Sequence, residues 1–329
     1  MTRPRIALLR GHNANPWDLR PWEELVDRFD VVCLATGSNR YDLGSLRLPV
    51  RRVRALRDYL PRGEAGDLAV KGPGDRYLGL ADALAGADLV HSAELGLWFS
   101  RQPALLKRRL GFKLVVTVWE TIPLRRTYRT ARGARFRAET LPEVDHYLAV
   151  TERARDCLLL EDVPPERIEL APAGIDRDRF ARGSARELSE HVILSPGRLV
   201  WEKGHQDVLR ALAALERGLV GGDPVRARLL VVGAGPERER LLRYAADLGL
   251  AARVELRSGV PYERMADVFA EASCVVLASL PIPLWEEQFG MVLAEALAAD
   301  LPIVASASGA IPEVLAGNGA LFEPGDWLG

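Results

Sequence analysis

The sequence is short of cysteine, of long apolar runs and of net charge, and each shortage excludes a class of protein. Its three cysteines, Cys33, Cys157 and Cys274, are widely spaced, so they predict neither a disulfide framework nor a metal site. The opening stretch MTRPRIALLRG has an apolar run of only four residues, too short for a signal peptide or a membrane span. A formal net charge of −1 gives no sign of a nucleic-acid partner. We therefore expect a soluble, cytoplasmic protein.

Short apolar runs alternate with helical patterns along the 329 residues, a length that favours two domains. Runs typical of strands are RIALLR, DVVCLAT, VRRV, DLVHSA, KLVVTV, HYLAV and IELAP, and then HVILSP, RLLVVG, VELRSG, CVVLAS, LPIVAS and ALFEP. This alternation predicts an α/β fold of parallel sheets covered on both faces. We expect two doubly wound, Rossmann-like domains, residues 1–175 and 190–329, joined by a polar linker at 176–189. Ligands of such sheets bind at the carboxyl ends of the strands, so two facing domains would each hold one substrate.

Lysine is scarce, since only four of the 44 basic residues are lysines, and one of them follows an expected strand. In SPGRLVWEKG, a strand ends near Ser195, and a turn at Gly197 leads to Arg198 and then Lys203. Two cations at the carboxyl end of a strand, beside a helix start, favour an anion such as a phosphate. A pair of solvated loop charges is an equally good interpretation.

Two acids, Glu287 and Glu295, stand eight residues apart in WEEQFGMVLAEALAAD. If the whole segment were helical, they would be about 12 Å apart, with helix-start N–H groups at 289–292 between them for a diphosphate. Glu295 has apolar neighbours, which is costly unless ligand hydroxyls or waters satisfy its carboxylate. The alternative is one capping acid and one surface acid.

A glycine-rich turn in VVGAGPERERLL resembles the start of a dinucleotide-binding fingerprint. Gly233 and Gly235 are present, but Arg238 occupies the place of the third glycine. The motif is therefore incomplete, which disfavours a dehydrogenase. We expect a tight strand-to-helix turn.

Polar residues also follow two expected strands of the first domain, in HNANPWDLRPW and VVTVWETIPL. The candidates for contact with an acceptor substrate are His12, Asn13, Asn15, Trp119 and Glu120. Helix capping by Asn15 or Asp18 is the alternative for the first segment. For Glu120, the alternatives are acid–base or hydroxyl-binding chemistry and a structural ion pair with an arginine.

The combination of these motifs resembles the retaining family 4 (group 1) glycosyltransferases, which have the GT-B fold. The resemblance is carried by Arg198 and Lys203-Gly204, by EQFG at 287–290 and by Glu295. The segments APAGIDRDRF and PIVASASGAIPEVL are also similar to that family. The resemblance covers nearly the whole chain and is strongest from residue 170 to residue 325.

The resemblance implies transfer of a sugar from a nucleotide-diphosphate sugar to an acceptor hydroxyl, with retention and with neither metal nor cofactor. The acceptor would be a glycan, a lipid-linked molecule or a small molecule. Implied catalytic residues are Arg198 and Lys203, which would hold the diphosphate, and Glu287, which would contact the donor sugar. Implied donor-binding residues are Gly197, Phe289, Gly290, Met291, Val292 and Glu295, with Glu295 on the ribose.

The chain departs from that family in three places. Trp119 stands where many members have a histidine, RGHNANPW replaces a Gly-Gly pair, and the chain stops at DWLG, where members continue with helices. A natural short C-terminus and a fragment both remain open. The alternatives for function are a sugar-nucleotide epimerase of similar architecture and a non-catalytic nucleotide-sugar-binding protein.

An arginine cluster offers one further interpretation, peripheral contact with the inner face of a membrane through anionic lipid. A solvated arginine-rich surface is the favoured alternative. The cluster consists of Arg125, Arg126, Arg129, Arg132, Arg135 and Arg137.

Overall fold

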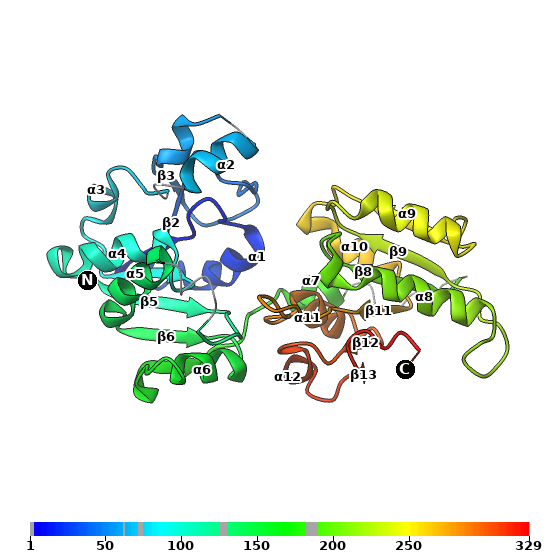
Figure 1. The fold of residues 1–329 in the computed structure, drawn as a ribbon. Coiled ribbons are helices and arrows are strands. Elements are labelled where there is room, and N and C mark those ends of the chain that lie inside the picture. Colours follow the sequence, from blue (N-terminus) through cyan, green and yellow to red (C-terminus); the bar gives the residue numbers. More distant parts are fainter. Residues whose placement is uncertain (1–2, 62, 72–74, 125–130, 182–189, 329) are drawn as a thin grey trace. The chain divides into compact units, whose positions relative to one another are not determined.

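The structure is a computed structural model, and it describes residues 3–61, 63–71, 75–124, 131–181 and 190–328. The chain forms two compact units, Met1–Gly174 and Ile175–Gly329 (Figure 1). Each unit is built on its own parallel β-sheet. The two units are described one at a time.

The first unit contains a seven-stranded sheet in the order β3-β2-β1-β4-β5-β6-β7, with every pair of neighbours parallel. Its strands are β1 (Arg5–Leu9), β2 (Asp30–Ala35), β3 (Val50–Arg52), β4 (Leu89–Ala93), β5 (Lys113–Val118), β6 (His146–Ala149) and β7 (Ile168–Leu170). Its helices are α1 (Pro16–Leu19), η1 (Arg20–Leu25), η2 (Leu56–Tyr59), α2 (Glu64–Lys71), α3 (Leu80–Leu84), α4 (Trp98–Leu110), α5 (Ala131–Thr140), η4 (Leu141–Glu143), α6 (Glu152–Leu159) and η5 (Pro165–Arg167). The strand order reverses between β1 and β4, which is where sheets of this kind bind ligands.

The second unit contains a six-stranded parallel sheet in the order β10-β9-β8-β11-β12-β13. Its strands are β8 (Val192–Pro196), β9 (Arg228–Val232), β10 (Val254–Arg257), β11 (Cys274–Leu277), β12 (Ile303–Ser306) and β13 (Ala320–Phe322). Its helices are α7 (Arg177–Ala181), η6 (Trp201–Lys203), α8 (His205–Glu216), α9 (Arg238–Asp247), η7 (Tyr262–Arg264), α10 (Met265–Ala270), α11 (Met291–Ala298) and α12 (Ile311–Leu315). Here the order reverses between β8 and β11, so the segments after these two strands lie next to each other.

Both faces of each sheet are buried, as the continuous apolar strands predict. In the first unit, Ala7 and Leu9 of β1 join one core cluster, and Ile6 and Leu8 join another. The second unit repeats this arrangement, because alternate residues of β9 belong to two different clusters. Successive side chains of a strand point to opposite faces, so each sheet lies between two apolar layers.

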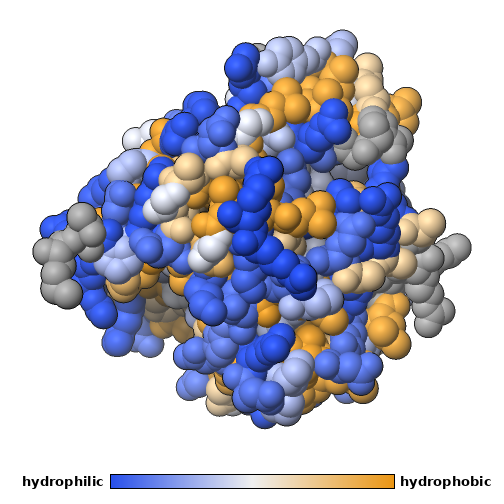
Figure 2. Space-filling view, turned by 90° about the vertical axis from the view of Figure 1, so that its left-hand side faces the viewer, coloured by the Kyte–Doolittle hydropathy of each residue, from blue (hydrophilic) through white to orange (hydrophobic). Residues whose placement is uncertain are grey.

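The predicted fold is confirmed, and each of the thirteen runs expected to form a strand does so. Of the expected linker at 176–189, residues 177–181 form α7, and residues 182–189 lie outside the described residues. Figure 2 shows a face on which polar residues predominate and apolar residues are interspersed. In the described part of the chain, no helix is both long and apolar enough to cross a membrane.

Candidate functional site

A buried ion pair lies at the carboxyl edge of the second sheet, where the strand order reverses. Lys203 follows β8 and Glu287 follows β11, and 2.6 Å separates Lys203 Nζ from Glu287 Oε2. Their side chains are only 13% and 9% exposed. The hydroxyl of Ser279 donates to the same carboxylate oxygen at 2.7 Å, and Lys203 Nζ lies 4.9 Å from the centre of the Trp285 ring. The fold thus brings together two of the three expected catalytic residues, in a site largely withdrawn from water.

Arg198, the third expected catalytic residue, lies on the same loop as Lys203 but is largely exposed. Its side chain is 61% exposed, and its nearest acidic partner is Glu202, at 3.8 Å. At that distance and exposure, the ion pair contributes little to stability. The guanidinium can therefore exchange this partner for an anionic ligand at small cost.

The loop after β8 is held by the glycine turn after β9. Leu199 N donates to Ala234 O at 2.9 Å, and Glu237 N donates to Leu199 O at 3.0 Å. A Cβ on Gly233 would lie 1.8 Å from Gly197 O, and one on Gly235 would lie 2.3 Å from Leu199 O. The turn therefore needs glycine for close backbone approach, as the sequence predicts for a tight turn.

Gly204 closes the same loop and is constrained in two ways. Its φ is 68°, in the left-handed region, and an added Cβ would lie 1.8 Å from Ala278 O. We expect Gly204→Ala to lower the free energy of unfolding by about 3 kcal/mol or more, because the strain of the left-handed backbone adds to the clash. Chemical denaturation would measure this change.

Gly249 provides the matched control for that substitution. Its φ is 78°, and an added Cβ would meet no atom within 4 Å. Gly249→Ala should therefore cost only the strain of the left-handed backbone, about 1–2 kcal/mol. Equal losses in the two variants would show that the contact with Ala278 is unimportant.

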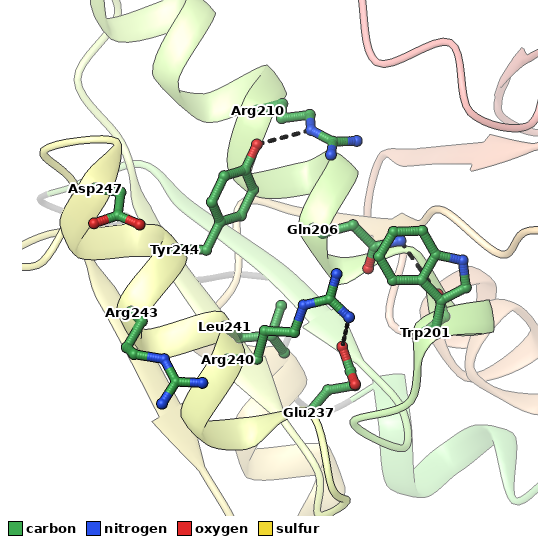
Figure 3. Close-up of a pocket in the computed structure, with 9 residues that line it drawn as sticks. All are labelled: Trp201, Gln206, Arg210, Glu237, Arg240, Leu241, Arg243, Tyr244 and Asp247. Carbon is green, nitrogen blue, oxygen red and sulfur yellow. Dashed lines mark hydrogen bonds and ion pairs between the residues drawn. The ribbon is translucent and has the colours of Figure 1, made fainter.

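The side chain of Arg240, in α9, reaches the loop that follows β8 (Figure 3). Its guanidinium carbon lies 4.8 Å from the centre of the Trp201 ring, and its Nη1 donates to Glu237 at 3.1 Å. Gln206 Nε2 donates to Trp201 O at 3.2 Å. These residues line a cavity of about 250 Å³ between α8 and α9. The short turn between Arg198 and Lys203 is thus fixed by side chains of α8 and α9.

His205, which the sequence analysis did not single out, supports the backbone of Arg198. The ring is 1% exposed, its Nδ1 lies 2.9 Å from Ser195 Oγ, and its Nε2 lies 3.1 Å from Arg198 O. Burial lowers the pKa of His205 to about 4, although the hydrogen bond to Arg198 O opposes the shift. The imidazole is therefore neutral at pH 7. A histidine at the first position of a helix, directly after Lys-Gly, was the available signal.

This depressed pKa makes stability depend on pH with a definite sign. Between pH 6.5 and pH 4 the unfolded chain takes up a proton on His205 and the folded chain does not, so acid favours unfolding. The shift corresponds to about 3 kcal/mol, lost as the pH falls from 7 to 4. We expect the stability of His205→Gln to fall less than that of the wild type over this pH range, because the variant has no imidazole to protonate on unfolding. Urea denaturation of both proteins between pH 7 and pH 4 would show it, and parallel stability curves would contradict it.

Glu295 is buried in α11, and protein groups already satisfy it. The residue is 3% exposed, and its carboxylate is hydrogen-bonded to Tyr262 and attracted by Arg179. The Arg179 guanidinium lies 4.3 Å from the centre of the Tyr262 ring. Burial raises the pKa of Glu295 to about 7, against the opposing effects of Tyr262 and Arg179. The expectation that only a ligand or water could satisfy this acid is therefore wrong.

The two acids do not share one helix, which corrects a second expectation. Helix α11 begins at Met291, after Gly290 with a left-handed φ of 77°, so residues 287–290 are not helical. The predicted helical separation of the two acids therefore has no structural basis. The backbone of Glu287 is instead held by the segment after β12, where Ala310 N donates to Glu287 O at 2.9 Å. Gly309 permits this approach, because a Cβ there would lie 2.1 Å from Glu287 O.

The first unit carries the acceptor-side candidates at the carboxyl edge of its sheet. His12 lines a cavity of about 620 Å³. Asn15 caps α1, because its Oδ1 accepts from Asp18 N at 2.9 Å, and its Nδ2 donates to Asn13 O at 2.9 Å. The structure therefore confirms the capping alternative for Asn15. Asn13 makes this contact with Asn15 through its backbone carbonyl oxygen, not through its side chain.

The remaining candidates lie at the end of β5 and in the arginine cluster. Glu120 is 6% exposed and accepts from Ile122 N at 3.1 Å, and Trp119 N donates to Glu94 at 2.8 Å. Within the cluster, Arg135 pairs with Glu139 at 2.7 Å, and Arg137 pairs with Glu161. Arg125, Arg126 and Arg129 lie outside the described residues.

Both halves of the chain match glycosyltransferase family models. A glycosyl transferase 4-like domain matches residues 19–174, and the glycosyl transferases group 1 model matches residues 176–328. The chain is 32% identical over 246 residues to a GDP-mannose-dependent alpha-(1-6)-phosphatidylinositol monomannoside mannosyltransferase of Mycolicibacterium smegmatis, covering 67% of the chain and 60% of that protein. It is 32% identical over 185 residues to a D-inositol 3-phosphate glycosyltransferase of Mycobacterium tuberculosis, covering 53% of the chain and 36% of that protein. The chain thus spans less than two thirds of either relative.

Solved structures show the same fold. Anabaena HepE in complex with UDP superposes with a TM-score of 0.72 at 17% identity, covering 99% of this chain and 87% of that chain. An E. coli trehalose-6-phosphate protein bound with UDP-2-fluoro glucose superposes with a TM-score of 0.70 at 15% identity, covering 98% and 88%. From the two matched halves, the shared fold and the sequence relatives, the chain belongs to the group 1 glycosyltransferases, which have the GT-B fold.

Proposed function

We propose that the chain transfers a sugar from a nucleotide-diphosphate sugar to an acceptor hydroxyl, with retention and without a metal ion. The observation that carries this proposal is the buried Lys203–Glu287 pair, next to the exposed Arg198, where the strand order reverses. The name of the mannosyltransferase relative includes a GDP-mannose donor, and HepE was solved with UDP. Both ligands contain a nucleoside diphosphate, which supports a donor of this class for the chain. The epimerase alternative is not favoured, since both halves match transferase models.

The site supplies positive charge where the reaction creates negative charge. The bond from the anomeric carbon of the donor to the diphosphate oxygen breaks, and its electron pair stays on the leaving diphosphate. Arg198, Lys203 and backbone N–H groups at the start of α11 stabilise that charge. The acceptor oxygen bonds to the anomeric carbon on the face that the diphosphate leaves, and the hydroxyl proton passes to a phosphate oxygen. No metal ion enters this scheme.

The two acids have separate roles in the proposal. Glu287, already fixed by Lys203 and Ser279, accepts hydrogen bonds from hydroxyls of the donor sugar. Glu295 accepts from the ribose, where it shares its carboxylate with Tyr262. Gly197, with a φ of 156°, and the backbone at 289–292 border the phosphates. Trp119, Glu120 and His12 remain proposed acceptor-side residues.

A thermal-shift screen of UDP, GDP, ADP and their sugars tests the proposal. We expect one nucleoside diphosphate and its sugar to raise the Tm, because a ligand at about 100 times its Kd stabilises the folded state by about 2.7 kcal/mol. Arg198→Ala should lose most of this shift. If no nucleotide stabilises the protein, the assignment of a nucleotide-sugar donor is wrong.

A further inference from the structure

A cavity of about 250 Å³ lies between α8 and α9 of the second unit (Figure 3). The described residues that line it do not include Arg198, Lys203 or Glu287. Its charged side chains are three arginines and two acids, namely Arg210, Arg240, Arg243, Glu237 and Asp247. Pockets for drug-sized ligands have about 300–1,000 Å³, so this cavity suits a smaller molecule.

Two of the arginines have N–H groups to which no described residue is bonded. Arg210 Nε donates to Tyr244 Oη at 2.8 Å, and its Nη1 pairs with Asp207. Arg240 Nη1 donates to Glu237 at 3.1 Å. Among the described residues, none accepts from Arg210 Nη2 or from Arg240 Nε and Nη2. Figure 3 shows the Arg210 side chain coming from α8 and the Arg240 side chain from α9, so both helices supply donors to one cavity.

The acids of the cavity leave its cations available to a ligand. In their ion pair, Arg240 and Glu237 are 58% and 21% exposed, and an exposed pair contributes little to stability. An anionic ligand can therefore replace Glu237 at small cost. Arg243 is exposed and forms no ion pair with a described residue, so the third arginine is available as well.

These donors favour a phosphate over a neutral ligand. Guanidinium groups bind phosphate oxygens through paired N–H groups, and several arginines can share the oxygens of one phosphate. Asp247 is exposed and no described residue pairs with it, so its carboxylate can accept a hydrogen bond from a hydroxyl. Leu241 and the rings of Trp201 and Tyr244 offer apolar contact to carbon atoms. The lining is therefore suited to a small phosphate monoester that carries hydroxyls.

The cavity also touches the turn that carries Lys203. Trp201 lines the cavity and begins η6, which ends at Lys203. The carbonyl of Trp201 accepts from Gly204 N at 3.1 Å and from Gln206 Nε2 at 3.2 Å. Its ring lies 4.8 Å from the guanidinium carbon of Arg240. A ligand that fixes Arg240 would therefore restrain this turn.

We propose that the cavity binds a small hydroxylated phosphate monoester through Arg210, Arg240 and Arg243, and that this ligand is an effector of the donor site. The effector role rests on the proposed function, whereas the binding itself does not. Restraint of the turn at Trp201 reduces the ordering that donor binding requires, so the effector should tighten donor binding. The ligand only binds, and no covalent step is involved.

Isothermal titration calorimetry of the full chain with glycerol 3-phosphate tests the binding, with glycerol as the neutral probe. We expect the phosphate ester to bind and glycerol not to bind. Arg240→Ala and Arg243→Ala should each weaken the ester about tenfold or more, because each removes charge-assisted hydrogen bonds. Inorganic phosphate should bind more weakly than the ester, and an equal affinity would overturn the assignment of an ester.

Two control variants separate this cavity from other sites that could hold an anion. Arg198→Ala should leave the affinity for glycerol 3-phosphate unchanged, since Arg198 is assigned to the donor diphosphate. Arg155 forms an ion pair of the same i,i+3 spacing with Glu152, at 2.9 Å, on α6 of the first unit, and Arg155→Ala should also have no effect. The proposal is overturned if glycerol 3-phosphate does not bind, or if either control weakens it as much as Arg243→Ala does.

Nucleotide titrations test the effector role and separate it from the proposed function. Saturating glycerol 3-phosphate should lower the Kd of the stabilising nucleoside diphosphate about fivefold or more in the wild type, and not in Arg243→Ala. An unchanged Kd would overturn the effector role. Nucleotide stabilisation without binding of glycerol 3-phosphate would overturn only this inference. Binding of the ester to a protein that no nucleotide stabilises would instead overturn the proposed transferase function.

Discussion

Arg198→Ala is expected to lower the rate of sugar transfer by about 100- to 1,000-fold at saturating donor, while the protein stays folded. The rate falls because the guanidinium supplies charge to the leaving diphosphate. The fold is preserved because the side chain is 61% exposed and lies 3.8 Å from its acidic partner. The change in the free energy of unfolding should be within about 0.5 kcal/mol.

The matched control for Arg198 is Arg226, an exposed arginine of the same unit that precedes β9. It lies at the amino end of its strand, and Arg198 follows the carboxyl end of β8, so the two occupy opposite edges of the sheet. Arg226→Ala should leave transfer unchanged. Near-wild-type turnover in Arg198→Ala would refute its assignment, and equal losses in both variants would point to a general effect of charge.

Lys203→Met is expected to abolish transfer and also to destabilise the protein, in contrast to Arg198→Ala. Removal of the ammonium leaves Glu287 as a buried carboxylate without its cation, which costs about 3 kcal/mol. The pair is 2.6 Å apart and largely buried, so water cannot take over the role of the lysine. Urea denaturation and a transfer assay of the same preparation would separate the two effects.

A double variant distinguishes the loss of charge from the loss of fold. Lys203→Met combined with Glu287→Gln removes both charges, and most of the lost stability should return. Transfer should not return, because the leaving diphosphate still lacks its cation. Recovery of activity in the double variant would mean that Lys203 acts by neutralising Glu287 and not by contacting the donor.

The fold could be predicted from the sequence because the apolar pattern alone determines it. Strands that are buried on both faces have continuous apolar runs, and each of the thirteen such runs became a strand. The positions of Arg198 and Lys203 followed from the same pattern, since both come shortly after the end of β8. Topology then placed the ends of β8 and β11 side by side.

The partners of the site residues could not be predicted in the same way. Tyr262 and Arg179 lie far from Glu295 in the sequence and on other helices, so no spacing rule connects them. The helical interpretation of 287–295 failed at Gly290, whose left-handed backbone starts the helix later. His205 was missed because a single polar residue acquires its meaning from burial, which only packing determines.

Release of nucleoside diphosphate from a nucleotide sugar, measured with an acceptor and with an excess of chelator, tests the central claim most directly. The account predicts acceptor-dependent release that the chelator does not reduce, because Arg198, Lys203 and backbone N–H groups stabilise the diphosphate. It also predicts that Arg198→Ala loses this release. Release that requires an added divalent cation, or no release from any UDP- or GDP-sugar, would contradict it.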